Sequence, residues 1–310
     1  MRVIITGGSG LIGRALTVDL ATAGHEVIIL SRTPQQVQGL PHNAYAMGWD
    51  TRTANGWADQ VTGATAIVNL AGSSLAGEGF LPARWTDKRK QSIRQSRLES
   101  GQAVVDAVRR ADDKPVIVIQ SSAIGYYGSQ SDDIIDEDHA PGDDFLAQLC
   151  VDWENSTAAV EDYGVRRAII RSGLVLSTQD GSLPRVILPY KFYVGGPFGN
   201  GKQWWSWIHL HDEVRAIRFL IDSVEAHGPF NLTSPNPLPN NDFGRTLARV
   251  MRRPHLIPVP GFAMHALFGE VSMVVLEGQR VIPRRLHELG FQFEFPELEI
   301  ALRDLFRRRI

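Results

Sequence analysis

The first thirteen residues of the chain, MRVIITGGSGLIG, restrict its fold more than any other stretch. A short apolar run at residues 3–6 leads directly into a cluster of glycines, and a helical pattern begins right after it. Within this cluster, Gly7, Gly10 and Gly13 stand in the spacing G-x-x-G-x-x-G. The order of buried strand, glycine turn and helix predicts the first unit of an α/β fold.

Each of these glycines has a separate role in a turn that faces a dinucleotide. Gly7 permits the tight turn, Gly10 lets the backbone approach a pyrophosphate, and Gly13 allows the helix to pack closely on the strand. The helix N-terminus adds free N–H groups and the positive end of its dipole. The sequence therefore predicts a dinucleotide site that includes Thr6, Gly7, Gly10, Leu11, Ile12 and Gly13.

The end of the second predicted strand, at residues 26–30, indicates the type of cofactor. An acidic residue at this place would bind the ribose 2′-hydroxyl and repel a 2′-phosphate. The chain instead has Ser31 and Arg32, whose hydroxyl and guanidinium suit a phosphate. These two residues predict NADP(H) as the cofactor; the alternative is an arginine that is merely exposed at a strand end.

Strand and helix patterns alternate over the first half of the chain. Further strand patterns lie at residues 44–49, 65–70, 115–119 and 165–171, and helical patterns lie at 87–110 and 143–163. We therefore predict an α/β fold with a Rossmann-type doubly wound parallel sheet in a domain of residues 1–175. Residues 176–310 are expected to form a smaller, mainly helical substrate part, from which strands near 204–232 return to the sheet.

Composition excludes several classes of function. A formal charge of -2 gives no reason to expect nucleic acid or an anionic membrane as a partner. Cys150 is the only cysteine, and His209 and His211 have no cysteine or carboxylate cluster beside them, so we expect no metal site. The chain shows no signal-peptide pattern and no apolar run of about 20 residues, which favours a cytoplasmic location.

Two further strand ends are expected beside the cofactor. The segment NLAG follows the strand pattern at 65–70, and its small residues leave room for the adenosine and its ribose. Its predicted cofactor-binding residues are Asn69, Leu70, Ala71 and Gly72. The strand pattern at 115–119 leads into the segment QSSAIGYYG at 120–128.

These motifs together resemble the extended, or atypical, short-chain dehydrogenase/reductase superfamily, and within it the YfcH-like NAD(P)-dependent epimerase family. The resemblance covers nearly the whole chain. It is carried by TGGSGLIG at 6–13, SRTP at 31–34, NLAG at 69–72, SSAIGYYG at 121–128, DDFLAQLCVDWE at 143–154, RSGLVLS at 171–177, GGPFGNGKQWWSWIHLHD at 195–212 and EGQRVIPRRLHELGFQF at 277–293.

The resemblance implies a catalytic serine after the fifth strand and a Tyr-x-x-x-Lys pair on the next long helix, where the tyrosine moves a proton during hydride transfer. Ser122 matches the serine. The tyrosine and lysine positions fall at about Leu146 and Cys150, so both of these catalytic side chains are absent. By the same analogy, Ser121 and Arg171 are expected near the nicotinamide end of the cofactor.

Two functions remain open on this basis. In the first, the chain is an NADP(H)-dependent oxidoreductase or epimerase that acts on a small carbonyl or hydroxyl compound or a sugar nucleotide, with Ser122 and Tyr126 or Tyr127 as catalytic residues. In the second, it binds NADP(H) without turnover, as a regulatory or redox-sensing protein. The two tyrosines could equally pack in the interior. Trp204, Trp205 and Trp207 are expected either to line the substrate side or to pack between the two parts.

Overall fold

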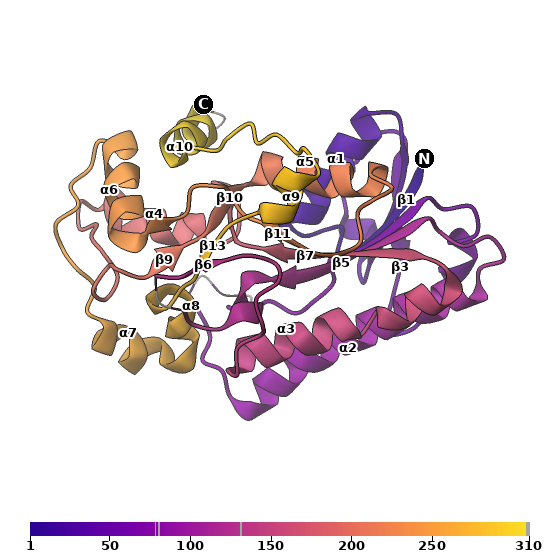
Figure 1. The fold of residues 1–310 in the computed structure, drawn as a ribbon, viewed down its shortest axis with the longest axis horizontal. Helices are drawn as coiled ribbons and strands as arrows, with labels where there is room; N and C mark the ends of the chain where they lie inside the picture. The colour runs from indigo at the N-terminus through magenta and orange to yellow at the C-terminus, as the bar shows by residue number, and fades with distance from the viewer. Residues whose placement is uncertain (78, 80, 131, 308–310) are drawn as a thin grey trace.

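The computed structural model describes residues 1–77, 79, 81–130 and 132–307. A seven-stranded parallel sheet forms the centre of this described part of the chain (Figure 1). In sheet order its strands are β11 (Gly228–Leu232), β7 (Arg166–Ser172), β5 (Ile117–Ala123), β4 (Ala66–Asn69), β1 (Arg2–Thr6), β2 (Glu26–Ser31) and β3 (Ala44–Gly48).

The strand order reverses direction between β1 and β4. From β1 the chain moves outward to β2 and β3, and it then crosses to β4 and continues on the other side. Such a reversal opens a crevice at the carboxyl ends of the two central strands, where doubly wound folds bind their ligands. The predicted doubly wound parallel sheet is therefore confirmed, and the glycine turn after β1 lies at the crevice.

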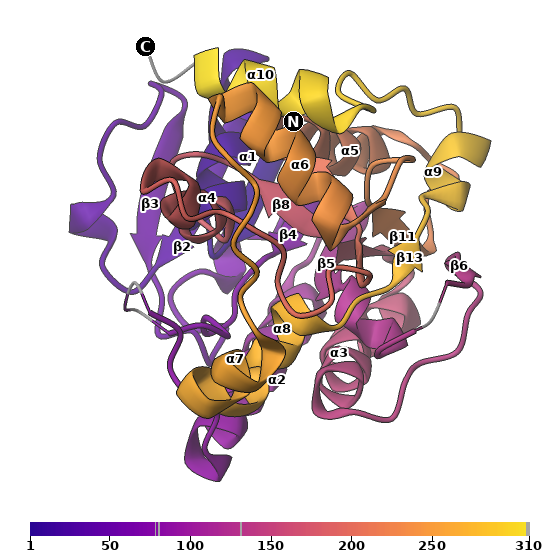
Figure 2. The ribbon, with the colours of Figure 1, turned by 90° about the vertical axis from the view of Figure 1, so that its left-hand side faces the viewer.

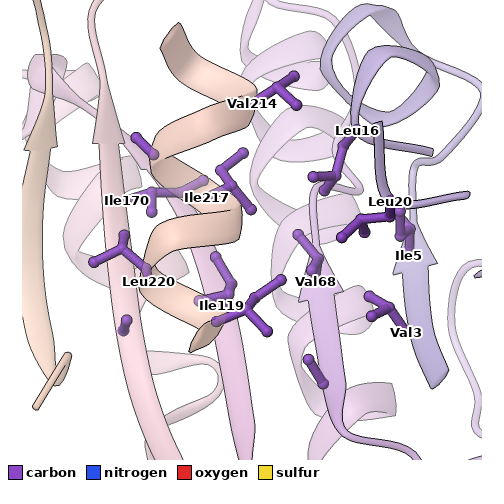
Figure 3. Close-up of a cluster of buried hydrophobic side chains, with 14 of the residues drawn as sticks. Val3, Ile5, Leu16, Leu20, Val68, Ile119, Ile170, Val214, Ile217 and Leu220 are labelled. Atoms are coloured by element: carbon purple, nitrogen blue, oxygen red, sulfur yellow. The ribbon is translucent and has the colours of Figure 1, made fainter. Parts of the chain in front are cut away.

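Helices cover both faces of the sheet, which explains why the central strands are apolar without alternation. In Figure 1, α1 (Leu11–Thr22) and α5 (Leu210–Asp222) lie on one face, and α2 (Asp87–Arg110) and α3 (Phe145–Asn155) lie on the other. Figure 3 shows the first interface, where Ile5 and Ile119 of the sheet meet Leu16 from α1 and Ile217 from α5.

Two elements differ from their predicted limits in ways that affect the site. The strand expected at 115–119 extends as β5 to Ala123, so Ser121 and Ser122 are part of a strand and their side chains point to opposite faces of the sheet. The helix expected at 143–163 divides into α3 and a 3-10 segment at Ala158–Tyr163.

The later part of the chain contributes to the central sheet and also builds a separate cluster. β11 joins the central sheet, whereas the neighbouring strands form two-stranded sheets outside it. These pairs are β8 (Leu174–Leu176) with β10 (Trp207–His209), β9 (Trp204–Trp205) with β12 (Leu238–Pro239), and β6 (Ile134–Ile135) with β13 (Arg280–Val281).

The helices of this later part pack around a second core. α4 (Leu183–Lys191), α6 (Asn240–Met251) and α10 (Leu298–Arg307) enclose the buried side chains of Trp205 and Trp207. Figure 2 shows α6 and α10 side by side. The remaining helices are α7 (Gly261–Phe268), α8 (Met273–Leu276) and α9 (Arg284–Glu288). No helix in the described ranges is both long enough and apolar enough to cross a membrane.

Candidate cofactor and substrate site

A cavity of about 480 Å³ opens at the carboxyl ends of the strands, between the central sheet and the later part of the chain. Its sheet side includes Gly7, Gly10, Leu11, Ile12, Gly13 and Leu70. Its far side includes Trp204, Trp205, Ser206, Val275, Gly278 and Gln279. One continuous space therefore joins the glycine turn to the later part of the chain.

The glycine turn is built so tightly that side chains could not replace Gly7 or Gly13. Gly7 has a φ of +66°, and a Cβ atom there would lie 2.8 Å from the carbonyl oxygen of Leu70. A Cβ on Gly13 would lie 2.7 Å from the carbonyl oxygen of Gly7. Gly10 caps α1 without a side-chain hydrogen bond, and the first N–H groups of a helix have no partner within it. Leu11 and Ile12, the first two residues of this helix, line the cavity.

A chain of side-chain hydrogen bonds holds the strand ends beneath this turn. The Thr6 hydroxyl donates to Asn69 Oδ1 at 2.6 Å and accepts the Ala71 N–H at 3.2 Å. Asn69 Nδ2 donates in turn to Gln120 Oε1 at 2.9 Å. Thr6 and Asn69 are buried away from the cavity lining, so in this structure they position the loop at Leu70.

Ser31 and Arg32 lie at the end of β2, next to the glycine turn. The parallel register pairs Thr6 with Leu30, which brings Ser31 level with Gly7. The Ser31 hydroxyl accepts the N–H of Thr33 at 3.2 Å, and Arg32 is exposed. Both residues lie outside the cavity lining, as do Ala71 and Gly72.

The two positions where the superfamily has its tyrosine and lysine do face the cavity. Leu146 and Cys150 are both in the lining, together with Ser121. Burial raises the pKa of the Cys150 thiol to about 11, and the charge of Glu154 adds to this effect. The cavity wall at these positions is consequently apolar at Leu146 and uncharged at Cys150.

Ser122 points away from the cavity and into a buried ion pair. Arg171 and Glu154 form this pair through two hydrogen bonds, Nε to Oε1 at 2.8 Å and Nη2 to Oε2 at 2.9 Å. The Ser122 hydroxyl donates to the same Glu154 Oε1 at 2.7 Å. Burial alone would lower the pKa of Arg171, but the hydrogen bonds and charge of Glu154 outweigh burial and raise this pKa.

The two predicted tyrosines belong to the same buried network. The Tyr127 hydroxyl donates to Asn231 Oδ1 at 2.7 Å and accepts from Arg171 Nη1 at 3.0 Å, and burial raises its pKa. The Tyr126 ring lies 3.4 Å from the guanidinium carbon of Arg171. Ser122, Tyr126, Tyr127 and Arg171 all lie outside the cavity lining, so their predicted catalytic and cofactor-binding roles receive no support from this arrangement and stay predictions.

A buried acid that was not predicted from the sequence, Glu213, lies behind the cavity wall. Ser172 lines the cavity, and its hydroxyl donates to Glu213 Oε1 at 2.5 Å. Glu213 is fully buried, and its Oε2 has no hydrogen-bond partner in the described part of the chain. Burial raises the pKa of this carboxyl to about 8. Its position in the sequence could have indicated its burial. Glu213 lies one helical turn before Ile217 and two turns before Leu220, on the buried face of α5.

The tryptophan-rich segment, residues 204–207, contributes side chains both to the cavity and to the second core. Trp204 and Trp205 line the cavity, whereas Trp207 is fully buried among the helices of the later part. A Cβ on Gly278 would lie 2.0 Å from the Trp204 carbonyl oxygen, so the segment at 277–279 presses directly on Trp204. Trp207 thus packs inside the later part of the chain, and a role of Trp204 and Trp205 on the substrate side stays a prediction.

A family model described as the NAD dependent epimerase/dehydratase family matches residues 3–233. The chain belongs to this family. A second model, described only as a domain of unknown function, matches residues 259–305. The predicted resemblance is thereby confirmed over the sheet domain and the first strands of the later part.

Similar proteins agree with this membership over the whole chain. The epimerase family protein YfhF of Bacillus subtilis is 38% identical over 310 residues, covering 100% of this chain and 99% of its own. The epimerase family protein SH2119 of Staphylococcus haemolyticus is 41% identical over 303 residues, covering 97% of this chain and 98% of its own.

Two solved structures of the family are also similar in sequence. The human epimerase family protein SDR39U1, solved with NADPH, is 32% identical with a TM-score of 0.88, covering 99% of both chains. A nucleoside-diphosphate sugar epimerase from Corynebacterium glutamicum is 33% identical with a TM-score of 0.76, covering 98% of this chain and 58% of its own. Membership in this NAD(P)-dependent family agrees with the glycine turn at the head of the cavity.

Proposed function

We propose that the chain is an NADP(H)-dependent oxidoreductase or epimerase whose cofactor and substrate share the cavity at the strand ends. The observation that carries this proposal is the continuous space from the glycine turn to the tryptophan-rich segment, in a chain 32% identical to a human protein solved with NADPH. A small carbonyl or hydroxyl compound or a sugar nucleotide is the substrate class. The family membership supports this class.

The cofactor would bind through backbone groups at one end and side chains at the other. The pyrophosphate would accept from the N–H groups at the start of α1, at Leu11 and Ile12, because the first N–H groups of a helix lack helix partners and these two residues line the cavity. The adenosine 2′-phosphate would bind Ser31 and Arg32, which stand level with the turn. Bound there, NADP(H) supplies hydride transfer, and the protein supplies position.

The Ser172 and Glu213 pair is the structural candidate for moving the accompanying proton. Because burial raises the pKa of Glu213 to about 8, the carboxyl is mainly protonated at neutral pH. The Ser172 hydroxyl lines the cavity and donates to Glu213 Oε1, so the pair would carry a proton between a bound substrate and the buried carboxyl. Ser122 and Tyr127 remain the alternative from the sequence, although their hydroxyls are held by Glu154, Asn231 and Arg171.

Cofactor choice is tested by a double substitution, Ser31→Asp with Arg32→Ala. Because the change removes charge-assisted hydrogen bonds and adds a repelling carboxylate, the Kd for NADPH should rise about ten- to hundredfold. The Kd for NADH should change by less than about threefold. Fluorescence titration measures both constants, with Arg109→Ala at the far end of α2 as a control. Equal rises in Kd for NADPH and NADH would contradict the NADP(H) assignment.

Catalysis is tested by screening carbonyl compounds and sugar nucleotides while NADPH absorbance and sugar products are followed. Once a substrate turns over, Ser172→Ala and Glu213→Gln should each reduce kcat about 100-fold or more, and Ser122→Ala should keep most of it. The reverse ranking, with Ser122→Ala or Tyr127→Phe inactive, would restore the sequence-based assignment. Tight binding of NADPH without turnover across a broad panel would favour the regulatory alternative. The presence of Leu146 and Cys150 in the cavity wall, in place of the catalytic tyrosine and lysine, supports that alternative.

A further inference from the structure

An exposed apolar face lies on the later part of the chain, outside the cavity lining. Three segments form it: residues 192–194 after α4, residues 256–257 in the connection from α6 to α7, and the start of α7. Its most exposed side chains are Leu256 and Phe262, at 78% each. In Figures 1 and 2, α7 lies at the outer edge of the molecule. Contiguous apolar surface of this kind marks an interaction site.

Backbone hydrogen bonds hold the segments of this face together. The N–H groups of Leu256 and Ile257 both donate to the carbonyl oxygen of Gly195, at 2.8 and 3.1 Å. The N–H of Gly199 donates to the carbonyl oxygen of Val259 at 2.9 Å, two residues before α7 begins. The exposed side chains therefore belong to one fixed surface.

The helix α7 is apolar around its whole circumference, and yet it is not buried. Its sequence GFAMHALF contains no lysine, arginine or acid, and none of its eight residues is buried in the structure. A helix that is apolar on all sides is stable when another apolar phase covers it. The protein itself does not supply this cover.

Two residues of the face have a backbone conformation that side chains rarely adopt. Tyr193 has a φ of +62° and Arg252 a φ of +54°, and they are two of the three described residues other than glycine with positive φ. The guanidinium carbon of Arg253 lies 4.3 Å from the centre of the Tyr193 ring. Such strain is found where a function maintains it. Here it keeps an exposed tyrosine beside two arginines.

The rim of the face carries positive charge without acidic partners. Residues 181–211 and 243–269 contain seven lysines and arginines and no acid, an excess that the formal charge of -2 for the whole chain conceals. Lys191, Arg252 and Arg253 adjoin the apolar side chains, and the described residues offer these three cations no acidic partner. The face therefore suits a partner that is both apolar and anionic.

We propose that this apolar and basic face binds the surface of an anionic lipid bilayer. The aromatic and aliphatic side chains enter the headgroup region, and the three cations contact lipid phosphates. A second copy of the chain fits poorly, because pairing the face with itself would bring the same cations together. A protein partner would need a fitted pocket for each projecting side chain, whereas the fluid bilayer interface needs none.

The experiment is co-sedimentation of the full chain with vesicles of phosphatidylcholine alone, or of equimolar phosphatidylcholine and phosphatidylglycerol. The wild type should bind the anionic vesicles at least about tenfold more tightly, and binding should weaken as salt rises. Lys191→Gln with Arg252→Gln should lower the affinity for anionic vesicles about tenfold. The charge-matched control, Arg109→Gln with Arg110→Gln at the far end of α2, should leave it unchanged.

A second pair of variants tests the apolar contribution. Leu256→Ser with Phe262→Ser should weaken binding to anionic vesicles at least about tenfold, at low and at high salt. The control is Val116→Ser with Val224→Ser, which changes two exposed apolar side chains elsewhere and should bind like the wild type.

The inference is overturned if the wild type does not bind anionic vesicles at low salt, or if the control pairs lose as much affinity as the variants of the face. It is also wrong if the wild type binds polyglutamate but not vesicles, which would assign an acidic polypeptide. A wild-type dimer that Leu256→Ser with Phe262→Ser abolishes would assign the face to a second copy instead. The comparison of the two vesicle types with the wild type decides even if a variant does not fold.

Discussion

At the scale of single residues, the buried acids Glu154 and Glu213 differ in how their charges are compensated. Glu154 accepts two hydrogen bonds from Arg171 and one from Ser122. Glu213 accepts one, from the Ser172 hydroxyl, and burial raises its pKa to about 8. Glu154 therefore belongs to a fixed structural ion pair, whereas Glu213 is a carboxyl that can change its charge near neutral pH.

Glu213 should make the stability of the protein depend on pH. Its unfolded pKa is near the ordinary value of 4.5, so between about pH 4.5 and 8 the folded state binds a proton that the unfolded state has lost. Stability should accordingly fall as pH rises through this window. Because glutamine cannot ionise, Glu213→Gln should match the wild type near pH 5 and exceed it by about 3 kcal/mol near pH 8.5.

Urea unfolding at several pH values measures this difference, with Glu225→Gln on an exposed loop as the control. Parallel stability curves for the wild type and Glu213→Gln between pH 5 and 8.5 would show that the carboxyl is already ionised in the folded protein.

Residue roles could be predicted from the sequence where the backbone alone determines them. A Cβ on Gly7 or Gly13 would lie within 3 Å of backbone atoms, in keeping with the tight turn and close packing predicted for them. The partners of Ser122 and Tyr127 could not be predicted in this way. Ser122 bonds a residue 32 positions away, and Tyr127 bonds one 104 positions away.

At the scale of elements, the predictions were right where the apolar pattern agreed with the residues that end helices and strands. The helix predicted at 87–110 is α2, and it ends where the irregular segment before the next strand begins. The strand was expected to end at Ile119, where the apolar run stops and Gln120 begins a polar stretch. β5 instead pairs with β7 as far as Ala123, because Ser121 and Ser122 lie opposite Ile170 and Arg171 in the sheet. That extension turns the Ser122 side chain from the cavity toward α3.

At the scale of the whole molecule, the cavity depends on segments that are distant in the sequence. Gln279 donates to the Gly128 carbonyl oxygen at 2.5 Å, and Ser206 donates to the Gln279 carbonyl oxygen at 2.7 Å. These bonds join the loop after β5, the tryptophan-rich segment and the residue before β13, and all three segments contribute to the cavity lining. The sheet could be predicted from local patterns, but this closure could not, because it rests on contacts between residues up to 151 positions apart.

The structure of the protein crystallised with NADPH tests the central proposal most directly. The account predicts the pyrophosphate on the N–H groups of Leu11 and Ile12, and the 2′-phosphate within hydrogen-bond distance of Ser31 and Arg32. It also predicts that the nicotinamide enters the part of the cavity lined by Leu146, Cys150 and Ser172. A cofactor bound away from the glycine turn, or an unfilled cavity at saturating NADPH, would contradict it.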